Sequence, residues 1–135
     1  SDNSPDDSVK IAKEYKCKNI ELPENNGPAF ARNVGADKAE GDILFFVDSD
    51  VIIKKNALTH INEIFSNNEI NVLQGVYSHK PFYKNIATQY QQSFYCYYTW
   101  QKDKKYASTL ASMCFAIRKK IFIQFFQEVS GAAKK

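Results

Sequence analysis

Apolar residues along the chain fall into short unbroken runs and into helically spaced sets, and the two patterns alternate. The clearest run is Ile43 to Val47, five consecutive apolar residues that end abruptly at Asp48, Ser49 and Asp50. A run this short, rich in β-branched and aromatic side chains, is typical of a strand buried on both faces, as in a parallel sheet. The pattern predicts a buried strand with two carboxylates at its carboxyl end.

The remaining elements continue this alternation. Helical spacing and helix-start signals predict helices over residues 4–15, with Ser4 as the cap, from Pro28 onward, over 56–66 and over 119–129. Strand patterns cover residues 18–22, 71–77 and 109–117, and Gly75 marks a bend or a close approach of backbone. Strands and helices in this order predict an α/β fold with a mostly parallel sheet sandwiched by helices.

The segment that follows Pro81 is crowded with aromatic residues. Ile86, Tyr90, Phe94 and Tyr97 are spaced by three or four positions, which predicts a long helix. We expect this helix to be packed on both sides in the core, in preference to forming a ligand platform. The last helix is expected to bury its own apolar side chains, Ile121, Phe122, Phe125 and Phe126.

Length and charge narrow the class of protein. With 135 residues and 44% hydrophobic content, the chain can bury one core, and we expect a single domain over residues 1–135. The net charge of +3 is too small and too evenly spread to indicate a nucleic-acid partner. Two basic clusters, within residues 102–105 and 118–120, are expected to be solvated faces.

The cysteines bear on the compartment. Cys17, Cys96 and Cys114 are odd in number, widely separated and without metal-ligand spacing, which favours reduced thiols and a cytoplasmic location. No run approaches the roughly 18 apolar residues of a membrane-spanning helix. We therefore expect no segment that crosses a bilayer.

The two acids after the Ile43–Val47 run are candidate metal ligands. Because Asp48 and Asp50 are two residues apart, they would share one face of an extended strand or converge in a turn. Magnesium and manganese are typically held by one or two carboxylates together with substrate phosphate oxygens. The Asp-x-Asp spacing alone is a weak signal, since acids after strands are also ordinary turn formers. On spacing alone, a structural turn is the better interpretation.

The segments around Asp48 and Asp50 favour a metal site over a structural turn. Four stretches in fixed order resemble the family 2 glycosyltransferases of the GT-A fold: Leu22–Ala29, Ala31–Gly35, Ala39–Asp42 and Phe45–Asp50. The resemblance covers roughly Asp2 to Tyr77, and more loosely Phe115–Phe122, where that family follows a strand with an arginine-led helix. It implies a partial GT-A fold.

The resemblance also implies a chemistry and a set of site residues. The donor would be a nucleotide diphosphate sugar, the acceptor a saccharide or a lipid-linked acceptor, the transfer inverting, and the cofactor Mn²⁺ or Mg²⁺. Asp50 matches the position that binds the metal and the donor diphosphate, and Asp48 the position that binds the metal or the donor's ribose. Arg32 matches a position near the nucleotide. The alternative interpretation is that Arg32 forms a surface salt bridge. Asp2 matches an acid that contacts the base. The alternative interpretation is that Asp2 is a terminal residue without a functional role.

The chain departs from the family pattern at both ends. It begins just after the first strand, helix and second strand of the family, and it stops before the segment that carries the catalytic base. We therefore expect the central part of a glycosyltransferase domain, with no identifiable catalytic base. One alternative is a non-catalytic nucleotide-binding or interaction module that forms a homodimer through an open sheet edge. Another places the aromatic helix and the basic clusters in peripheral contact with the inner face of a membrane.

Overall fold

The computed structural model describes residues 1, 3, 5–78, 85–100 and 113–132. The chain divides into two compact units, Ser1–Leu44 and Phe45–Lys135, and each is described by itself. Among the described residues, no helix is long and apolar enough to pass through a bilayer. The single domain expected over residues 1–135 stays a prediction.

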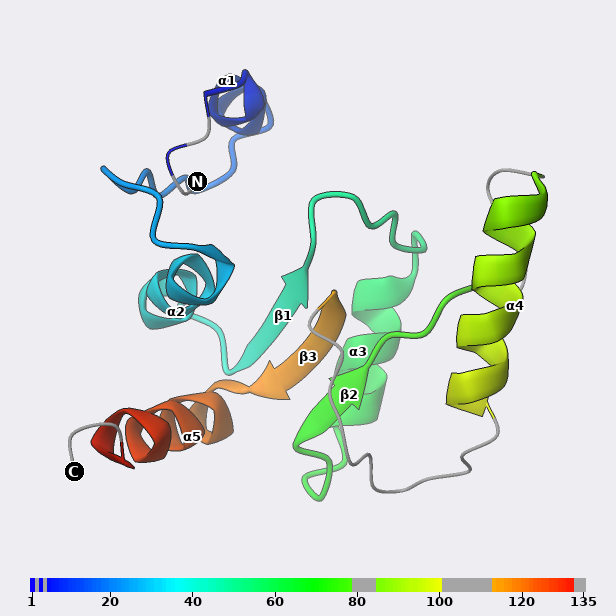
Figure 1. Cartoon of the computed structure of the whole chain (residues 1–135). Helices are drawn as coiled ribbons and strands as arrows, with labels where there is room; N and C mark the ends of the chain where they lie inside the picture. Colours follow the sequence, from blue (N-terminus) through cyan, green and yellow to red (C-terminus); the bar gives the residue numbers. More distant parts are fainter. Residues whose placement is uncertain (2, 4, 79–84, 101–112, 133–135) are drawn as a thin grey trace. The chain divides into compact units, whose positions relative to one another are not determined.

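The first unit contains two helices, α1 (Ser8–Glu14) and α2 (Pro28–Lys38) (Figure 1). α1 begins later than predicted, because Asp6 and Asp7 precede the helix: Asp7 occupies the cap position, and Asp6 Oδ1 accepts a hydrogen bond of 3.1 Å from the backbone N–H of Ser8. The predicted cap, Ser4, lies outside the described residues. Bonding to Ser8 also lowers the pKa of the Asp6 carboxyl.

The segment between these helices does not form the strand predicted over residues 18–22. Instead, its backbone is tied to the first residue: the amino group of Ser1 donates to the Ile20 carbonyl at 2.7 Å, and the Leu22 N–H donates to the Ser1 carbonyl at 2.9 Å. Two bonds of this kind are the pattern of a single parallel bridge. α2 then begins at Pro28 as predicted, after Gly27 with a positive φ of 84°.

The described sheet has three strands in the order β1–β3–β2. They are β1 (Ile43–Val47), β2 (Val72–Gln74) and β3 (Cys114–Arg118). β2 and β3 pair antiparallel, with Leu73 opposite Ala116. Figure 1 shows β1 and β2 pointing the same way, with β3 running in the opposite direction between them. β1 and β2 therefore share one direction, as the alternation predicted, and β3 runs antiparallel to both of its neighbours in the described sheet.

β3, not β1, is the buried strand of this sheet. Phe115, Ala116 and Ile117 are all buried, whereas in β1 only Leu44 is buried and Val47 is exposed. The burial of β1 on both faces was predicted wrongly, because an unbroken apolar run does not reveal which strand is central. β1 is an outer strand of the described sheet, and β3 lies between two others.

Aromatic packing connects β1 to β3 and to α5 (Lys119–Ala132), which follows β3 directly. The ring of Phe46 is stacked on Phe115 with centroids 4.7 Å apart, and it lies 5.2 Å from the ring of Phe122. Ile121 and Phe122 are half-buried, but Phe125 is exposed, contrary to the predicted burial. The side chain of Phe126 lies outside the described part.

Two further helices complete the second unit, α3 (Ala57–Phe65) and α4 (Ile86–Trp100). Both were predicted from helical spacing, and both form where expected. On α3 the apolar side is covered toward the carboxyl end, where Phe65 is buried and Ile61 and Ile64 are half-buried, whereas Leu58 near the start of the helix is exposed. On α4 the predicted burial is wrong for the described side chains of the stripe, because Ile86, Tyr90 and Phe94 are all exposed. The Tyr97 side chain is not among those described.

Candidate functional site

A cavity of about 580 Å³ lies at the carboxyl end of β1, entirely within the second unit. β1 ends at Val47, and the backbone then turns: the Val51 N–H donates to the Asp48 carbonyl at 3.0 Å. The Asp48 N–H donates to the Met113 carbonyl at 2.9 Å, which fixes this turn to the residue just before β3. The local fold thus places the two acids of the turn at a defined point beside the sheet.

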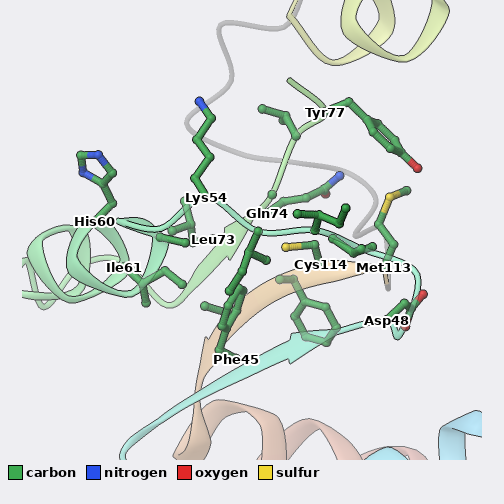
Figure 2. A pocket seen from close by; sticks show the side chains of 18 of the residues that line it. Phe45, Asp48, Lys54, His60, Ile61, Leu73, Gln74, Tyr77, Met113 and Cys114 are labelled. Carbon is green, nitrogen blue, oxygen red and sulfur yellow. The ribbon is translucent and has the colours of Figure 1, made fainter. Parts of the chain in front are cut away.

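Both predicted metal ligands line this cavity. Asp48 is half-buried and Asp50 is exposed. Figure 2 shows Asp48 just beyond the end of the strand, on the side of the cavity where Met113 and Cys114 lie. The structure therefore brings Asp48 and Asp50 to one cavity, as their position after the strand predicted.

Most of the cavity wall is apolar. In Figure 2, Phe45, Ile61 and Leu73 form the lower wall, and Lys54, Gln74 and Tyr77 extend toward the other side. The remaining lining includes the loop residues Val51, Ile52 and Ile53 and the start of α3. A ligand in this cavity would meet carboxylates at one end and aliphatic or aromatic surface over much of the rest.

Cys114 and Gly75 meet at the wall of this cavity. The Gly75 N–H donates to the Cys114 carbonyl at 2.9 Å, which continues the β2–β3 pairing by one residue. A Cβ added at Gly75 would lie 2.7 Å from Cys114 Sγ and 3.1 Å from the Cys114 carbonyl oxygen. Gly75 is thus a point of close approach, one of the two roles predicted for it. Burial, and then the negative charge of Asp48, raise the pKa of the Cys114 thiol.

Sequence reasoning did not identify the residue that holds the end of α3 in place. Arg118, at the end of β3, donates from Nη2 to the carbonyls of Phe65 and Asn67 at 2.9 and 3.0 Å, and from Nε to that of Ile70 at 2.9 Å. Its guanidinium also lies 5.3 Å from the centroid of the Phe65 ring. These carbonyls belong to the last residue of α3 and to the segment that follows, where a cation is favoured by the helix dipole.

Arg118 is therefore not simply part of a solvated basic cluster, as its sequence neighbours had indicated. Its contacts join residues 48 to 53 positions apart, and residues of α3 at the opposite end from Phe65, among them Ala57 and His60, line the cavity. The only signal in the sequence was its place after a strand, where the resemblance marked an arginine without giving it a role.

The carboxylates fit a divalent cation only as part of a larger ligand set. Among the described residues there is no group of three or more histidine, cysteine or acidic side chains placed to hold a metal ion. Asp48 and Asp50 provide hard oxygen ligands on one cavity. Magnesium and manganese are commonly held by one or two carboxylates, with waters and substrate phosphates as the other ligands. The residues present fit a cation that binds together with a phosphorylated substrate.

The other two predicted site residues belong to the first unit. Arg32 is half-buried on α2, and its neighbours Ala31, Val34 and Gly35 line a smaller hollow of about 210 Å³ that Ser1 and the segment 18–22 also border. Asp2 lies outside the described residues. The association of Arg32 and Asp2 with the two cavity acids stays a prediction.

Comparison with known proteins identifies the class. Residues 1–126 match glycosyl transferase family 2, so the chain belongs to this family. The α/β architecture agrees with the predicted partial GT-A fold. Over 82 residues the chain is 35% identical to an uncharacterized glycosyltransferase of Haemophilus influenzae, an alignment that covers 57% of this chain. The chain spans about a third (33%) of the length of that relative.

Proposed function

We propose that this protein takes part in the transfer of a sugar from a nucleotide diphosphate donor to an acceptor hydroxyl, with inversion at the anomeric carbon. The supporting observation is that Asp48 and Asp50 line one cavity at the end of β1 in a chain of glycosyl transferase family 2. In this reaction a bond forms between the acceptor oxygen and the anomeric carbon, while the bond from that carbon to the donor's phosphate oxygen breaks. The hydroxyl proton passes to a general base, for which no residue of this chain is proposed.

Asp48 and Asp50 would hold Mn²⁺ or Mg²⁺ at the donor diphosphate. Such a cation, when bound, supplies positive charge against the negative charge that grows on the departing diphosphate. Asp50 is the more exposed of the two and is assigned to the metal and the diphosphate. Asp48, held by its backbone bond to Met113, is assigned to the metal or the donor's ribose.

Arg32 and Asp2 are assigned to the nucleotide. The assignment of Arg32 is supported by its place on α2 next to Ala31, which lines the hollow of the first unit. Asp2 follows Ser1, one of the residues that border this hollow, and it is assigned to the base. A guanidinium is suited to phosphate oxygens and to stacking on a base.

Calorimetric titration of the chain with UDP, in the presence and absence of Mn²⁺, tests the metal and donor site. We expect binding that needs Mn²⁺ and that weakens by about tenfold or more in Asp50→Ala, because a charge-assisted ligand is lost. Asp42→Ala is the matched control: it removes the same charge at the other end of β1, and Asp42 does not line the cavity. Metal-independent binding, or equal loss in the two variants, would contradict the assignment of Asp50.

A second candidate function is a non-catalytic module that binds nucleotide and self-associates. Within the described residues β1 and β2 are the outer strands of the sheet, and an outer strand presents backbone groups to which another chain can pair. A sugar-nucleotide hydrolysis assay run beside light scattering separates the two candidates. A monomer with turnover excludes the module, whereas an inactive dimer favours it over the enzyme.

A further inference from the structure

The wall of the cavity in the second unit carries aliphatic side chains that are open to solvent. Ile52, in the loop after β1, is 80% exposed, Ile53 beside it is 41% exposed, and Val76, just after β2, is 55% exposed. All three line the cavity, so two segments of the chain contribute to this surface. Exposed aliphatic side chains are ordinary when scattered singly, but several around one cavity indicate a binding surface.

The histidine at this cavity does not offset the apolar character of the wall. Both ring nitrogens of His60 already have partners: Nε2 lies 2.8 Å from Asn56 Nδ2, and Nδ1 lies 3.2 Å from Glu63 Oε2. Phe45 and Leu73, which are half-buried, continue the apolar wall (Figure 2). Sugar hydroxyl groups pressed against such a wall would lose hydrogen bonds to water without gaining partners, which is unfavourable.

The position of the two acids indicates which part of a ligand would meet the wall. The cavity has a volume of about 580 Å³, which is within the usual range of small-molecule sites. With the proposed metal and diphosphate at Asp48 and Asp50, the rest of the cavity is left for the donor sugar and for the part of the acceptor next to its reacting hydroxyl. The donor sugar is rich in hydroxyl groups, whereas an acceptor can carry a hydrocarbon group. The aliphatic wall therefore matches the acceptor.

We propose that the acceptor carries an alkyl chain next to its reacting hydroxyl, and that Ile52, Ile53 and Val76 contact this chain. An alkyl chain suits the wall better than a planar aromatic group. The most exposed apolar members of the wall, Ile52 and Val76, are branched and aliphatic, so they offer no ring on which a planar group could stack. The name acceptor rests on the proposed function, but the binding of an alkyl chain to this wall does not.

Calorimetric titration of the whole chain with methyl, butyl, hexyl and octyl glucosides, without UDP or Mn²⁺ and below micelle-forming concentrations, tests the proposal. We expect the affinity to rise by about two- to fourfold for each added methylene, the increase that burial of a methylene group gives. The octyl compound should therefore bind at least roughly tenfold more tightly than the butyl compound. Hexyl glucoside should bind more tightly than phenyl glucoside, although their apolar groups have the same number of carbon atoms.

Two substitutions on different segments test the wall itself. Ile52→Asn and Val76→Asn should each weaken binding of octyl glucoside by about fivefold or more, because each places an amide against the chain. Leu58→Asn is the matched control: it introduces the same amide at an aliphatic side chain that is 63% exposed but does not line the cavity. We expect it to change binding by less than about twofold. All three positions are exposed, and circular dichroism checks that each variant is folded.

The proposal is overturned by equal affinity for butyl and octyl glucoside, by tighter binding of phenyl than of hexyl glucoside, or by equal loss in Ile52→Asn and Leu58→Asn. The titration also separates this proposal from the proposed function. If UDP binds with Mn²⁺ but affinity does not rise with chain length, the alkyl site fails and the proposed sugar transfer stands. If affinity rises with chain length but UDP does not bind, the alkyl site stands and the proposed sugar transfer fails.

Discussion

Helices α3 and α4 carry the same sequence signal, apolar residues three or four apart, but the burial of these apolar side chains differs between the two helices. On α3 the apolar side is buried toward the carboxyl end, where Phe65 is 4% exposed and the carbonyl of this residue accepts a hydrogen bond from Arg118. On α4, among the side chains that the structure describes (residues 86–94), Ile86, Tyr90 and Phe94 are exposed and Thr88 and Gln92 are half-buried. Apolar periodicity thus predicts that a helix forms, but not what covers its apolar side.

The two helices differ in the contacts that the described residues of the second unit provide for them. The end of α3 meets a guanidinium from β3 that satisfies three carbonyls at once. α4 buries little of its stripe, so the stability of this helix cannot depend much on those side chains. The three predictions that follow test this contrast through the free energy of unfolding.

The largest effect is expected for Phe65→Ala. Removing a buried aromatic ring should lower the free energy of unfolding by about 3–5 kcal/mol, from lost burial and the cavity left behind. Leu58→Ala on the same helix is the control, and because Leu58 is 63% exposed it should cost less than about 1 kcal/mol. Urea unfolding followed by circular dichroism measures both. Similar costs for the two variants would show that the inner side of α3 is not packed as described.

A smaller loss is expected for Arg118→Ala. This substitution removes three bonds to carbonyls and the contact with the Phe65 ring, and we expect a cost of about 2 kcal/mol. Arg118→Lys should restore only part of it, because a single ammonium lacks the forked geometry that reaches all three carbonyls. Lys120→Ala, nearby and exposed, should change stability by less than about 0.5 kcal/mol. Full recovery in Arg118→Lys would mean that charge alone holds the end of α3.

The smallest effect is expected for Tyr90→Ala on α4. Because the ring is mostly exposed, truncation should change the free energy of unfolding by no more than about 0.5 kcal/mol in aqueous buffer. The same unfolding experiment applies, with Phe65→Ala as the reference for a buried ring. A cost near that of Phe65→Ala would show that Tyr90 is covered within the chain.

Local patterns in the sequence were enough to predict most elements and the position of the acids. The Ile43–Val47 strand has the predicted bounds, and the helices at Pro28, near residue 56 and at Ile86 all form. Asp48 and Asp50 reach one cavity because a strand end followed by a tight turn is specified by adjacent residues. Such features depend on short stretches of chain, which periodicity and turn residues describe well.

The features that the sequence did not predict depend on contacts between distant residues. Which strand is central, β1 or β3, is decided by pairing across the sheet and not by either apolar run. The role of Arg118 rests on carbonyls some fifty residues away. Residues 18–22 alternate like a strand, but the structure forms no strand there, and Ile20 and Leu22 make backbone hydrogen bonds to Ser1 instead. Tertiary context overrode local preference in each case.

The close approach of Gly75 to Cys114 also limits how this sequence can vary. The two positions share one volume: even a methyl group at residue 75 would fall within 2.7 Å of the thiol sulfur. A smaller side chain at residue 114 would remove the contact with the sulfur, but the Cys114 Cβ and carbonyl oxygen, both at 3.1 Å, would still have to shift slightly. We therefore expect substitutions at these positions to be coupled, with a side chain at residue 75 tolerated only together with a smaller one at residue 114. In a selection from a library that varies both positions, the residues accepted at position 75 should depend on the residue present at position 114.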